Sequence, residues 1–319
     1  MNANLTTQHR PEDARPSQPA RRKKKQRTIA GVAPPHPVMR ALKGVLLTAC
    51  CLVVLLPLLS VISTSLAGQE EISEAGGYVL WPKDPTLDAY RSILSGGVVL
   101  QSVLVSILVT AVGTAIALVL TCTLAYSLSR PGSLGHKVIL MTVLLTFLFT
   151  PGMIPMYLLI KELGLLDSYW SLILPTTVTA FNVVIMRAFF LELPRELLDS
   201  ARIDGASEIR TLVSIVLPLS KAVIAVIGLF QAVSYWNNFF NALLYMSTPS
   251  KYPLQLVLRT YVVDNTEINP GDIDTVGTVP PQTALQMAIL VISVAAIALV
   301  YPFIQRHFAK GILIGAVKG

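Results

Sequence analysis

The charged residues with the most regular spacing in this chain lie between Asp199 and Pro218, in the stretch DSARIDGASEIRTLVSIVLP. Carboxylate and guanidinium groups at such spacing can form charge-assisted hydrogen bonds with another protein. Catalytic patterns are missing from the sequence: it has no GxxxxGK[ST] phosphate-binding loop, no HExxH and no GxSxG. The four histidines are scattered along the chain. We therefore expect the polar stretch to recognise a partner, and we expect no enzymatic reaction and no metal site in this chain.

The composition indicates the kind of chain that carries this stretch. Of the 319 residues, 53% are hydrophobic and only 13% are charged, whereas soluble domains carry about 25% charged residues. Apolar runs near 20 residues in length predict a protein that crosses a membrane several times. The cysteines Cys50, Cys51 and Cys122 fall inside these runs, so we expect them to be buried apolar side chains without a metal or redox role.

Six apolar segments are long enough to cross a bilayer as helices. They lack the alternation of a β-barrel, and a helix satisfies its own backbone hydrogen bonds in lipid. The predicted fold class is therefore an all-α membrane protein with six transmembrane helices. The predicted spans are residues 41–66, 98–128, 138–160, 170–190, 222–246 and 283–304.

The distribution of basic residues predicts the orientation. With the amino terminus inside, most of the 25 Lys and Arg residues fall in inner segments, which is the usual bias of cytoplasmic loops. We therefore expect both termini in the cytoplasm. Residues 1–38, which include RRKKKQR, read as a disordered basic tail that touches lipid and not nucleic acid. Residues 39–319 form the predicted six-helix transmembrane domain. The outer segments contain only Lys83, Arg91, Lys161, Lys251 and Arg259.

No Asp, Glu or Arg lies in the middle of any predicted span. Transporters driven by ions usually keep such a group for their coupling ion. An ion-coupled secondary transporter, or a channel that acts as a homodimer, stays open as an alternative because backbone carbonyls can bind sodium. A membrane enzyme or a scaffold is a further alternative, for which the sequence offers no catalytic constellation.

The polar stretch between the fourth and fifth predicted spans must lie outside the membrane. Seven charges at a bilayer centre would cost about 20 kcal/mol. Its local signals predict a helix, a sharp bend and a second helix. Pro194 suits a helix start, Leu197 and Leu198 form an apolar face with Ala201, Gly205 suits a left-handed cap, and Ser207 can cap the second helix.

The spacing of this stretch is specific. The pattern begins with an acid, a small residue and an alanine in a row. Three residues separate the alanine from a glycine, and nine residues separate that glycine from an isoleucine. One further residue then precedes Leu-Pro. This pattern resembles the EAA loop of permease subunits of binding-protein-dependent ABC importers. An acid and a small residue here replace the commonest Glu and Ala of that family. The landmark residues are Asp199, Ser200, Ala201, Gly205, Ile215, Leu217 and Pro218.

The resemblance extends from about residue 41 to the end of the chain. The segments LWPKDPTLDAYRSIL, IPMYLLIKELGLLDSYWSLILP, NVVIMRAFF, WNNFFNALLYM and the terminal GAVKG all look like carbohydrate-uptake permeases of the maltose type. Within that family the chain is most similar to the subgroup that handles complex or oligomeric sugars.

The resemblance implies a type I ABC importer permease fold with a cytoplasmic coupling helix between helices 4 and 5, in a loop at about residues 193–218. It implies a transmembrane subunit in a bacterial inner or plasma membrane that works with a second homologous permease, two ABC ATPase subunits and an extracytoplasmic sugar-binding protein. ATP and Mg would be bound by the ATPases, and this chain would hold no cofactor. The expected ATPase-coupling residues are Glu196, Asp199, Ser200, Ala201, Arg202, Asp204, Gly205, Ile215, Leu217 and Pro218.

A sugar path needs hydrogen-bonding side chains and aromatic faces. In the fifth predicted span four polar residues recur at helical steps, so they could share one face: Gln231, Ser234, Asn238 and Asn241. Hydrogen bonding between helices is the alternative role for such residues. The proline-rich TPGMIP at residues 150–155 predicts a kinked or broken third span. The candidate substrate-path residues are Asn182, Gln231, Ser234, Tyr235, Trp236, Asn237, Asn238 and Asn241.

Overall fold

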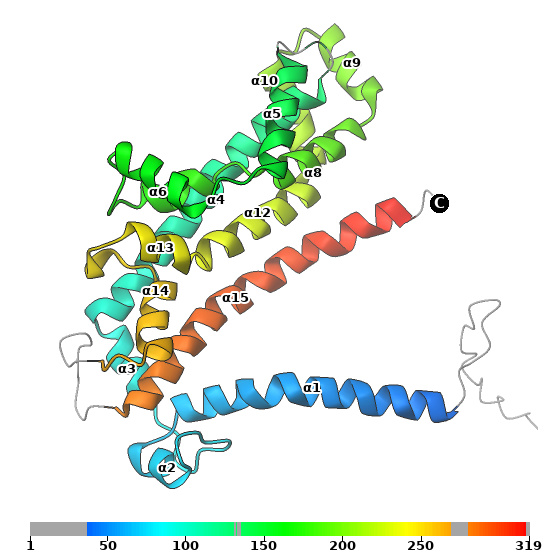
Figure 1. The fold of residues 1–319 in the computed structure, drawn as a ribbon. Helices are drawn as coiled ribbons and strands as arrows, with labels where there is room; N and C mark the ends of the chain where they lie inside the picture. The colour runs from blue at the N-terminus through cyan, green and yellow to red at the C-terminus, as the bar shows by residue number, and fades with distance from the viewer. Residues whose placement is uncertain (1–36, 131, 133–134, 269–279, 317–319) are drawn as a thin grey trace, which may run out of the picture. The chain divides into compact units, whose positions relative to one another are not determined.

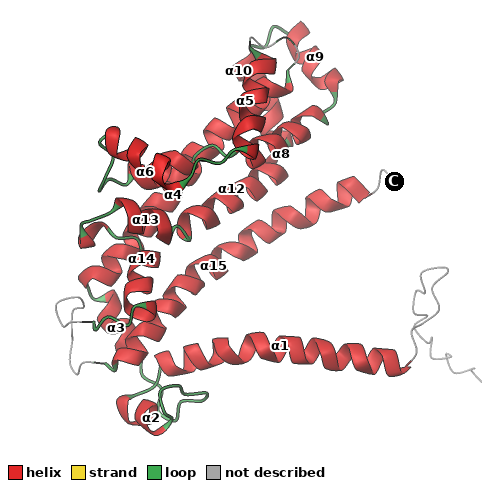
Figure 2. Ribbon diagram, in the orientation of Figure 1, coloured by secondary structure: helices red, strands yellow, loops and turns green. Residues whose placement is uncertain are grey.

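The structure is a computed structural model that describes residues 37–130, 132, 135–268 and 280–316, with side chains up to 299 and at 302. Every regular element in these residues is a helix (Figures 1 and 2), which agrees with the predicted all-α class. The predicted basic tail at residues 1–38 lies outside the described residues, except for Pro37 and Val38, which begin the first helix.

Helix α1, Pro37–Ser65, is apolar around its whole circumference and exposes nearly all of its side chains. Cys50 and Cys51 are among the exposed ones, so the expectation that they are buried in the chain is wrong. They lie on a helix whose side chains are exposed along most of its length, as expected for a span surrounded by lipid or partner helices. The described chain divides into two units within this helix, between Val53 and Val54.

The end of α1 is held by hydrogen bonds to the segment that follows it. Ser63 donates to the carbonyl of Leu80 at 2.9 Å, and Thr64 accepts from the amide of Val79 at 2.9 Å. Two short helices belong to this segment, α2 (Gln69–Glu74) and α3 (Asp88–Leu94).

Helix α4, Gly97–Ser129, packs against α8 (Ala180–Leu191) and α12 (Lys221–Trp236). Gly113 makes the contact with α12 possible, because a Cβ on this residue would lie 2.8 Å from the ring of Tyr235. Figure 1 shows α4 and α12 running beside each other. The third predicted span is broken, as TPGMIP indicated, into α5 (His136–Leu148) and α6 (Met153–Glu162).

The fourth predicted span is also interrupted. A single helical turn, α7 (Trp170–Ile173), continues into the 3₁₀ turn η1 (Leu174–Thr176) and is bent by 49° from α8. The bend leaves backbone carbonyls without helical partners. Side chains of α12 satisfy them: Gln231 donates to the carbonyl of Thr177 at 3.2 Å, and Tyr235 donates to that of Ile173 at 3.1 Å.

The fifth predicted span is not one helix. Helix α12 ends at Trp236, and α13 (Phe239–Tyr245) begins after Asn238, whose side chain accepts from the amide of Asn241 at 3.4 Å. Asparagine competes for backbone hydrogen bonds and favours caps, which explains the break. Because the break separates Asn238 and Asn241 from α12, the predicted helical face shared with Gln231 and Ser234 is wrong.

The described chain continues through the 3₁₀ turn η3 (Pro249–Lys251), α14 (Leu254–Leu258) and the π-helical turn η4 (Arg259–Val263). The last helix, α15, covers Gln282–Ala316 and packs against α12 and α3. The terminal GAVKG ends outside the described residues.

Three helices in the described residues are long and apolar enough to cross a membrane: α1, α4 and the first 18 residues of α15. The number is five if each of two bent pairs is counted as one span: α7–η1 with α8, and the helical segment Glu208–Leu219 with α12, which meet at 85°. The third predicted span consists of two short helices that do not meet this length. The protein is therefore a multi-pass membrane protein, and the count of six spans stays a prediction.

Candidate functional site

The polar loop begins with α9, Arg195–Ile203, which follows Pro194 as the sequence predicted. Its last turn closes with two backbone hydrogen bonds: Ala206 donates to the carbonyl of Ala201 at 2.9 Å, and Gly205 to that of Arg202 at 3.0 Å. Gly205 has φ = +75°, the left-handed conformation expected of a C-terminal cap in a Schellman motif. The sharp bend is therefore a property of the local backbone.

The second helical part of the loop starts with a capping side chain. The hydroxyl of Ser207 accepts from the amide of Arg210 at 3.3 Å, which confirms the predicted cap. Three short turns follow: α10 (Glu208–Thr211), the π-helical turn η2 (Leu212–Val216) and α11 (Leu217–Leu219). The predicted helix, bend and helix are all present.

The inner face of α9 consists of Leu198 and Ala201, which are each only 7% exposed. Leu198 belongs to an apolar cluster that also includes Leu212 and Val216 of the following turns. Leu197 was expected on this face, but it is 44% exposed, because it lies on the other side of the helix. The small side chain of Ala201 therefore allows close packing within this chain, and it does not form a surface for a partner.

Glu208 connects the loop to α4. Its carboxylate accepts from the Tyr126 hydroxyl at 2.5 Å and from Arg202 of α9 at 3.1 Å, and it lies 3.9 Å from the guanidinium of Arg130. The hydrogen bond from Tyr126, helped by the two arginines, holds the pKa of Glu208 below its usual value. Sequence reasoning included Glu208 among the loop's charges but not among the site residues, because its partner Tyr126 lies 82 residues away.

The outer face of the loop exposes large apolar side chains among charges. Ile203 is 86% exposed and Ile209 is 76% exposed. Of the predicted coupling residues, Glu196, Asp199, Ser200, Asp204 and Pro218 are also exposed, whereas Ile215 and Leu217 are partly buried. Arg202 is half exposed but already paired with Glu208. Exposed isoleucines beside carboxylates are typical of a surface that another protein covers.

The predicted substrate-path residues separate into two groups. Gln231 and Tyr235 are buried and hold the interrupted fourth span, and Trp236 donates to the carbonyl of Ser293 on α15 at 3.2 Å. These contacts are the interhelical hydrogen bonds that the sequence had left open as an alternative. Asn182 is buried within α8. Ser234 and Asn237 are exposed, whereas Asn238 and Asn241 are half-buried.

A cleft of about 830 Å³ lies between the interrupted third, fourth and fifth predicted spans. It is lined by the break between α5 and α6, by the bend before α8 and by α13, and Asn241 is the predicted path residue that faces it. Sequence reasoning missed Thr146 and Thr150 as part of this cleft, although the TPGMIP signal pointed to the right segment. The polar lining residues are Thr142, Thr146, Thr150, Thr179 and Asn241, and the aromatic ones are Phe147, Phe181, Phe240 and Tyr245.

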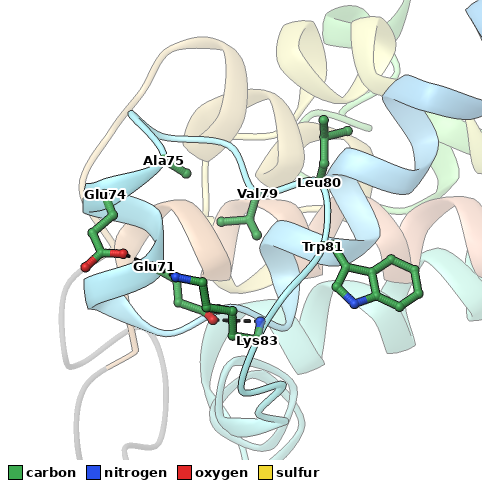
Figure 3. Close-up of a pocket in the computed structure, with 7 residues that line it drawn as sticks. All are labelled: Glu71, Glu74, Ala75, Val79, Leu80, Trp81 and Lys83. Atoms are coloured by element: carbon green, nitrogen blue, oxygen red, sulfur yellow. Dashed lines mark hydrogen bonds and ion pairs between the residues drawn. The ribbon is translucent and has the colours of Figure 1, made fainter.

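A separate pocket of about 320 Å³ lies in the segment between α1 and α3 (Figure 3). Glu71 accepts from the amide of Lys83 at 2.7 Å, and the ammonium group of Lys83 lies 3.7 Å from Glu74. Figure 3 shows the indole of Trp81 pointing away from these carboxylates, and it is 85% exposed. These contacts close the segment on itself, and no predicted site residue lies in this pocket.

Comparison with known proteins identifies the molecule. Residues 117–314, which contain the polar loop and the cleft, match the family model described as "Binding-protein-dependent transport system inner membrane component". The chain belongs to this family. Members are permease components, and the ATPase is a separate subunit, so this permease is not itself an enzyme.

Two relatives from Bacillus subtilis (strain 168) match the permease over most of its length. The polygalacturonan/rhamnogalacturonan transport system permease protein YtcP is 44% identical over 270 residues, which cover 84% of this chain and 94% of the relative. Protein LplC is 47% identical over 269 residues, with coverages of 84% and 90%.

A solved structure supports the same fold. A chain in the crystal structure of a bacterial ABC transporter involved in the import of the acidic polysaccharide alginate superimposes with a TM-score of 0.77 and 29% identity, covering 85% of this chain and 96% of that one. The permease is therefore an ABC importer component, and the alternative of an ion-coupled secondary transporter or channel is wrong.

Proposed function

We propose that this permease moves an oligosaccharide from an extracytoplasmic binding protein into the cytoplasm by alternating access. A second homologous permease and two ATPase subunits would complete the importer. ATP and Mg would be bound by those ATPases, so this chain would need no cofactor of its own. The six predicted spans and two cytoplasmic termini belong to the same proposal, which rests on the distribution of Lys and Arg residues.

The geometry of the polar loop is the single observation that carries the proposal. One face of α9 packs on the chain's own core, and its other side exposes Ile203 and Asp199. On the next helical turn, α10, Ile209 is exposed as well. We divide the proposed coupling residues into two groups. The residues that contact the ATPase are Glu196, Asp199, Ser200 and Asp204. The residues that shape and fix the loop are Ala201, Arg202, Gly205, Ile215, Leu217 and Pro218.

Force applied to α9 would reach the spans through Glu208. This carboxylate binds Arg202 of α9 and Tyr126 near the end of α4, and α4 packs against both α8 and α12. When the ATPases close on their nucleotide, the loop and these helices would move together as a rigid body. Such a movement can open the permease to the inside and close it to the outside.

The sugar would pass along the cleft between the interrupted spans. Threonine hydroxyls and the amide of Asn241 can exchange hydrogen bonds with sugar hydroxyls, and the aromatic rings offer apolar faces. The exposed Ser234 and Asn237 and the half-buried Asn238 stay candidates for the path, together with Asn182. Gln231, Tyr235 and Trp236 would support it from behind. The names of the relatives and of the solved transporter, which refer to polysaccharides, favour an oligosaccharide as the cargo.

The coupling role can be tested with Asp199→Arg in the importer reconstituted with its ATPases and binding protein. We expect normal membrane insertion and assembly of the permeases but little stimulation of ATP hydrolysis by sugar-loaded binding protein, because a positive charge replaces an exposed carboxylate at the proposed contact. Arg210→Gln, an exposed change of charge after the bend, serves as the matched control. Full stimulation in the Asp199→Arg variant would contradict the coupling role.

A further inference from the structure

A second pocket, of about 340 Å³, lies behind the coupling loop and is strongly basic. It is formed where α4 ends, where α5 begins and where α8 continues into α9. The charged and titratable side chains of its lining are Arg130, His136, Arg187, Arg195, Asp199 and Arg202. The proposed coupling mechanism uses Asp199, the acidic residue of this lining, together with Arg202, and it leaves Arg187 and Arg195 unexplained.

Two polar groups in this pocket are incompletely paired. Among the residues that the structure describes, the buried Nδ1 atom of His136 has no hydrogen-bond partner. The buried Nε atom of Arg130 has none either, although it lies 3.9 Å from Glu208 and the same guanidinium donates to the Tyr126 hydroxyl at 2.8 Å. Buried polar atoms without partners are rare, and each one calls for an explanation such as a missing ligand. Arg187 uses its Nε atom to donate to the carbonyl of Leu128 at 2.8 Å. Within the described part of the chain, neither Arg187 nor Arg195 forms an ion pair.

Two helices begin at this pocket. His136 is the first residue of α5 and Arg195 is the first residue of α9, and neither helix has a side chain that caps its free amides. The free amides and the positive end of the helix dipole attract an anion at such positions. Arginines, unpaired donors and two helix starts therefore all favour one kind of ligand, a phosphate group.

The surroundings of the pocket indicate where this phosphate comes from. The pocket lies at the ends of α4, α5 and α8, where the proposed spans would leave the membrane. On α5, directly after His136, an apolar groove of about 510 Å³ runs from Lys137 to Leu148. Val138 is 70% exposed and Leu148 is 73% exposed along it. Acyl chains can cover such a groove, whereas a free phosphate ion cannot.

We propose that this pocket binds the phosphate of an anionic phospholipid headgroup, with the acyl chains along α5. The lipid would connect α4, α5 and α8 to the coupling loop at the membrane surface. Basic pockets between transmembrane helices on the cytoplasmic side are suited to such headgroups. Through Arg195, the first residue of α9, the bound lipid would also steady this helix, so the coupling loop would depend on the membrane's composition.

The test measures lipid binding to the purified, assembled importer by native mass spectrometry, with phosphatidylglycerol and phosphatidylcholine added in turn. We expect phosphatidylglycerol to bind preferentially, and Arg195→Gln to weaken its binding roughly tenfold, which is the usual effect of losing one charged hydrogen bond. Arg195→Lys keeps the charge and should retain most of the binding. Lys221→Gln removes an exposed charge outside the pocket and should leave binding unchanged.

Three results would overturn the proposal. Equal binding of the two lipids would show that the site does not select for charge. Equal losses of binding in Arg195→Gln and Lys221→Gln would show that this pocket is not the binding site. Inorganic phosphate that binds in an Arg195-dependent way, without any preference for phosphatidylglycerol, would assign the pocket to a free ion. None of these measurements depends on transport, so they can fail while the proposed function stands.

Discussion

At the scale of single residues, the coupling loop depends on two positions that act in different ways. Gly205 sets the bend through its backbone, and Glu208 fixes the loop to α4 through its side chain. The first effect is local and the second spans the fold. Substitutions at the two positions should therefore differ in their dependence on pH.

Replacing Glu208 by Gln should lower the free energy of unfolding by about 1 kcal/mol at neutral pH, a modest value because the carboxylate is 56% exposed. The pKa of this carboxylate is lowered from its usual 4.5, so its contribution is present above pH 4.5 and disappears as the pH falls through the lowered value. Thermal midpoints of the two proteins should therefore converge in acid. Glu196→Gln, on the exposed side of α9, is the matched control and should leave the thermal midpoint at neutral pH unchanged.

Replacing Gly205 by Ala should destabilise the loop by about 1–2 kcal/mol, because an L-residue is strained at φ = +75°. No atom lies within 4 Å of the Cβ position, so the cost comes from the backbone and not from crowding. Asn tolerates this conformation better, and Gly205→Asn should keep most of the sugar-stimulated ATP hydrolysis that Gly205→Ala loses. Equal activities in the two variants would contradict a role for the left-handed cap.

At the scale of elements, interrupted spans are held by side chains of their neighbours. Gln231 and Tyr235 extend from α12 to the carbonyls before α8, and the ring of Tyr235 lies directly on α4 at Gly113. Tyr235 therefore takes part both in the contact of α4 with α12 and in the bend before α8. A substitution on α4 that displaces Tyr235 should affect both the contact and the bend.

Gly113→Ala tests this connection. Its Cβ would lie 2.8 Å from the ring of Tyr235, which is held by its hydrogen bond to Ile173, so the helices must separate. We expect a loss of about 1–3 kcal/mol, the usual cost of overpacking, measured as a lower thermal midpoint in detergent. Gly44→Ala on α1 meets no neighbour within 4 Å and should leave the midpoint unchanged or raise it.

At the scale of the whole molecule, the loop before α7 and the loop after α13 are joined by Asp167. Its carboxylate accepts from the amides of Ser247 and Thr248 at 3.0 Å each and from the ammonium group of Lys251 at 2.7 Å. The hydrogen bond from Lys251, followed by those from Thr248 and Ser247, holds the pKa of Asp167 well below its usual value. This junction connects the two helices that flank the proposed sugar cleft, α6 and α13.

Asp167→Asn should loosen this junction, because the amide keeps the shape but loses the charge that holds Lys251. Asn also tolerates the positive φ of this residue, 56°, so the backbone should stay unstrained. We expect faster amide exchange at residues 247–251, measured by mass spectrometry, together with slower sugar uptake. Asp84→Asn, which changes an exposed carboxylate elsewhere, is the control. Unchanged exchange at residues 247–251 would show that the junction does not depend on the ion pair.

The amino-acid sequence alone determined the features that depend on neighbouring residues. The membrane character, the cap at Ser207, the bend at Gly205 and the break at TPGMIP all follow from local backbone preferences and hydropathy. Only the tertiary structure decided which side chains meet. Glu208 binds Tyr126 across 82 residues and Gln231 holds the fourth span across 54 residues, so only helix packing brings these partners together. The same packing decides that Leu197 faces outward.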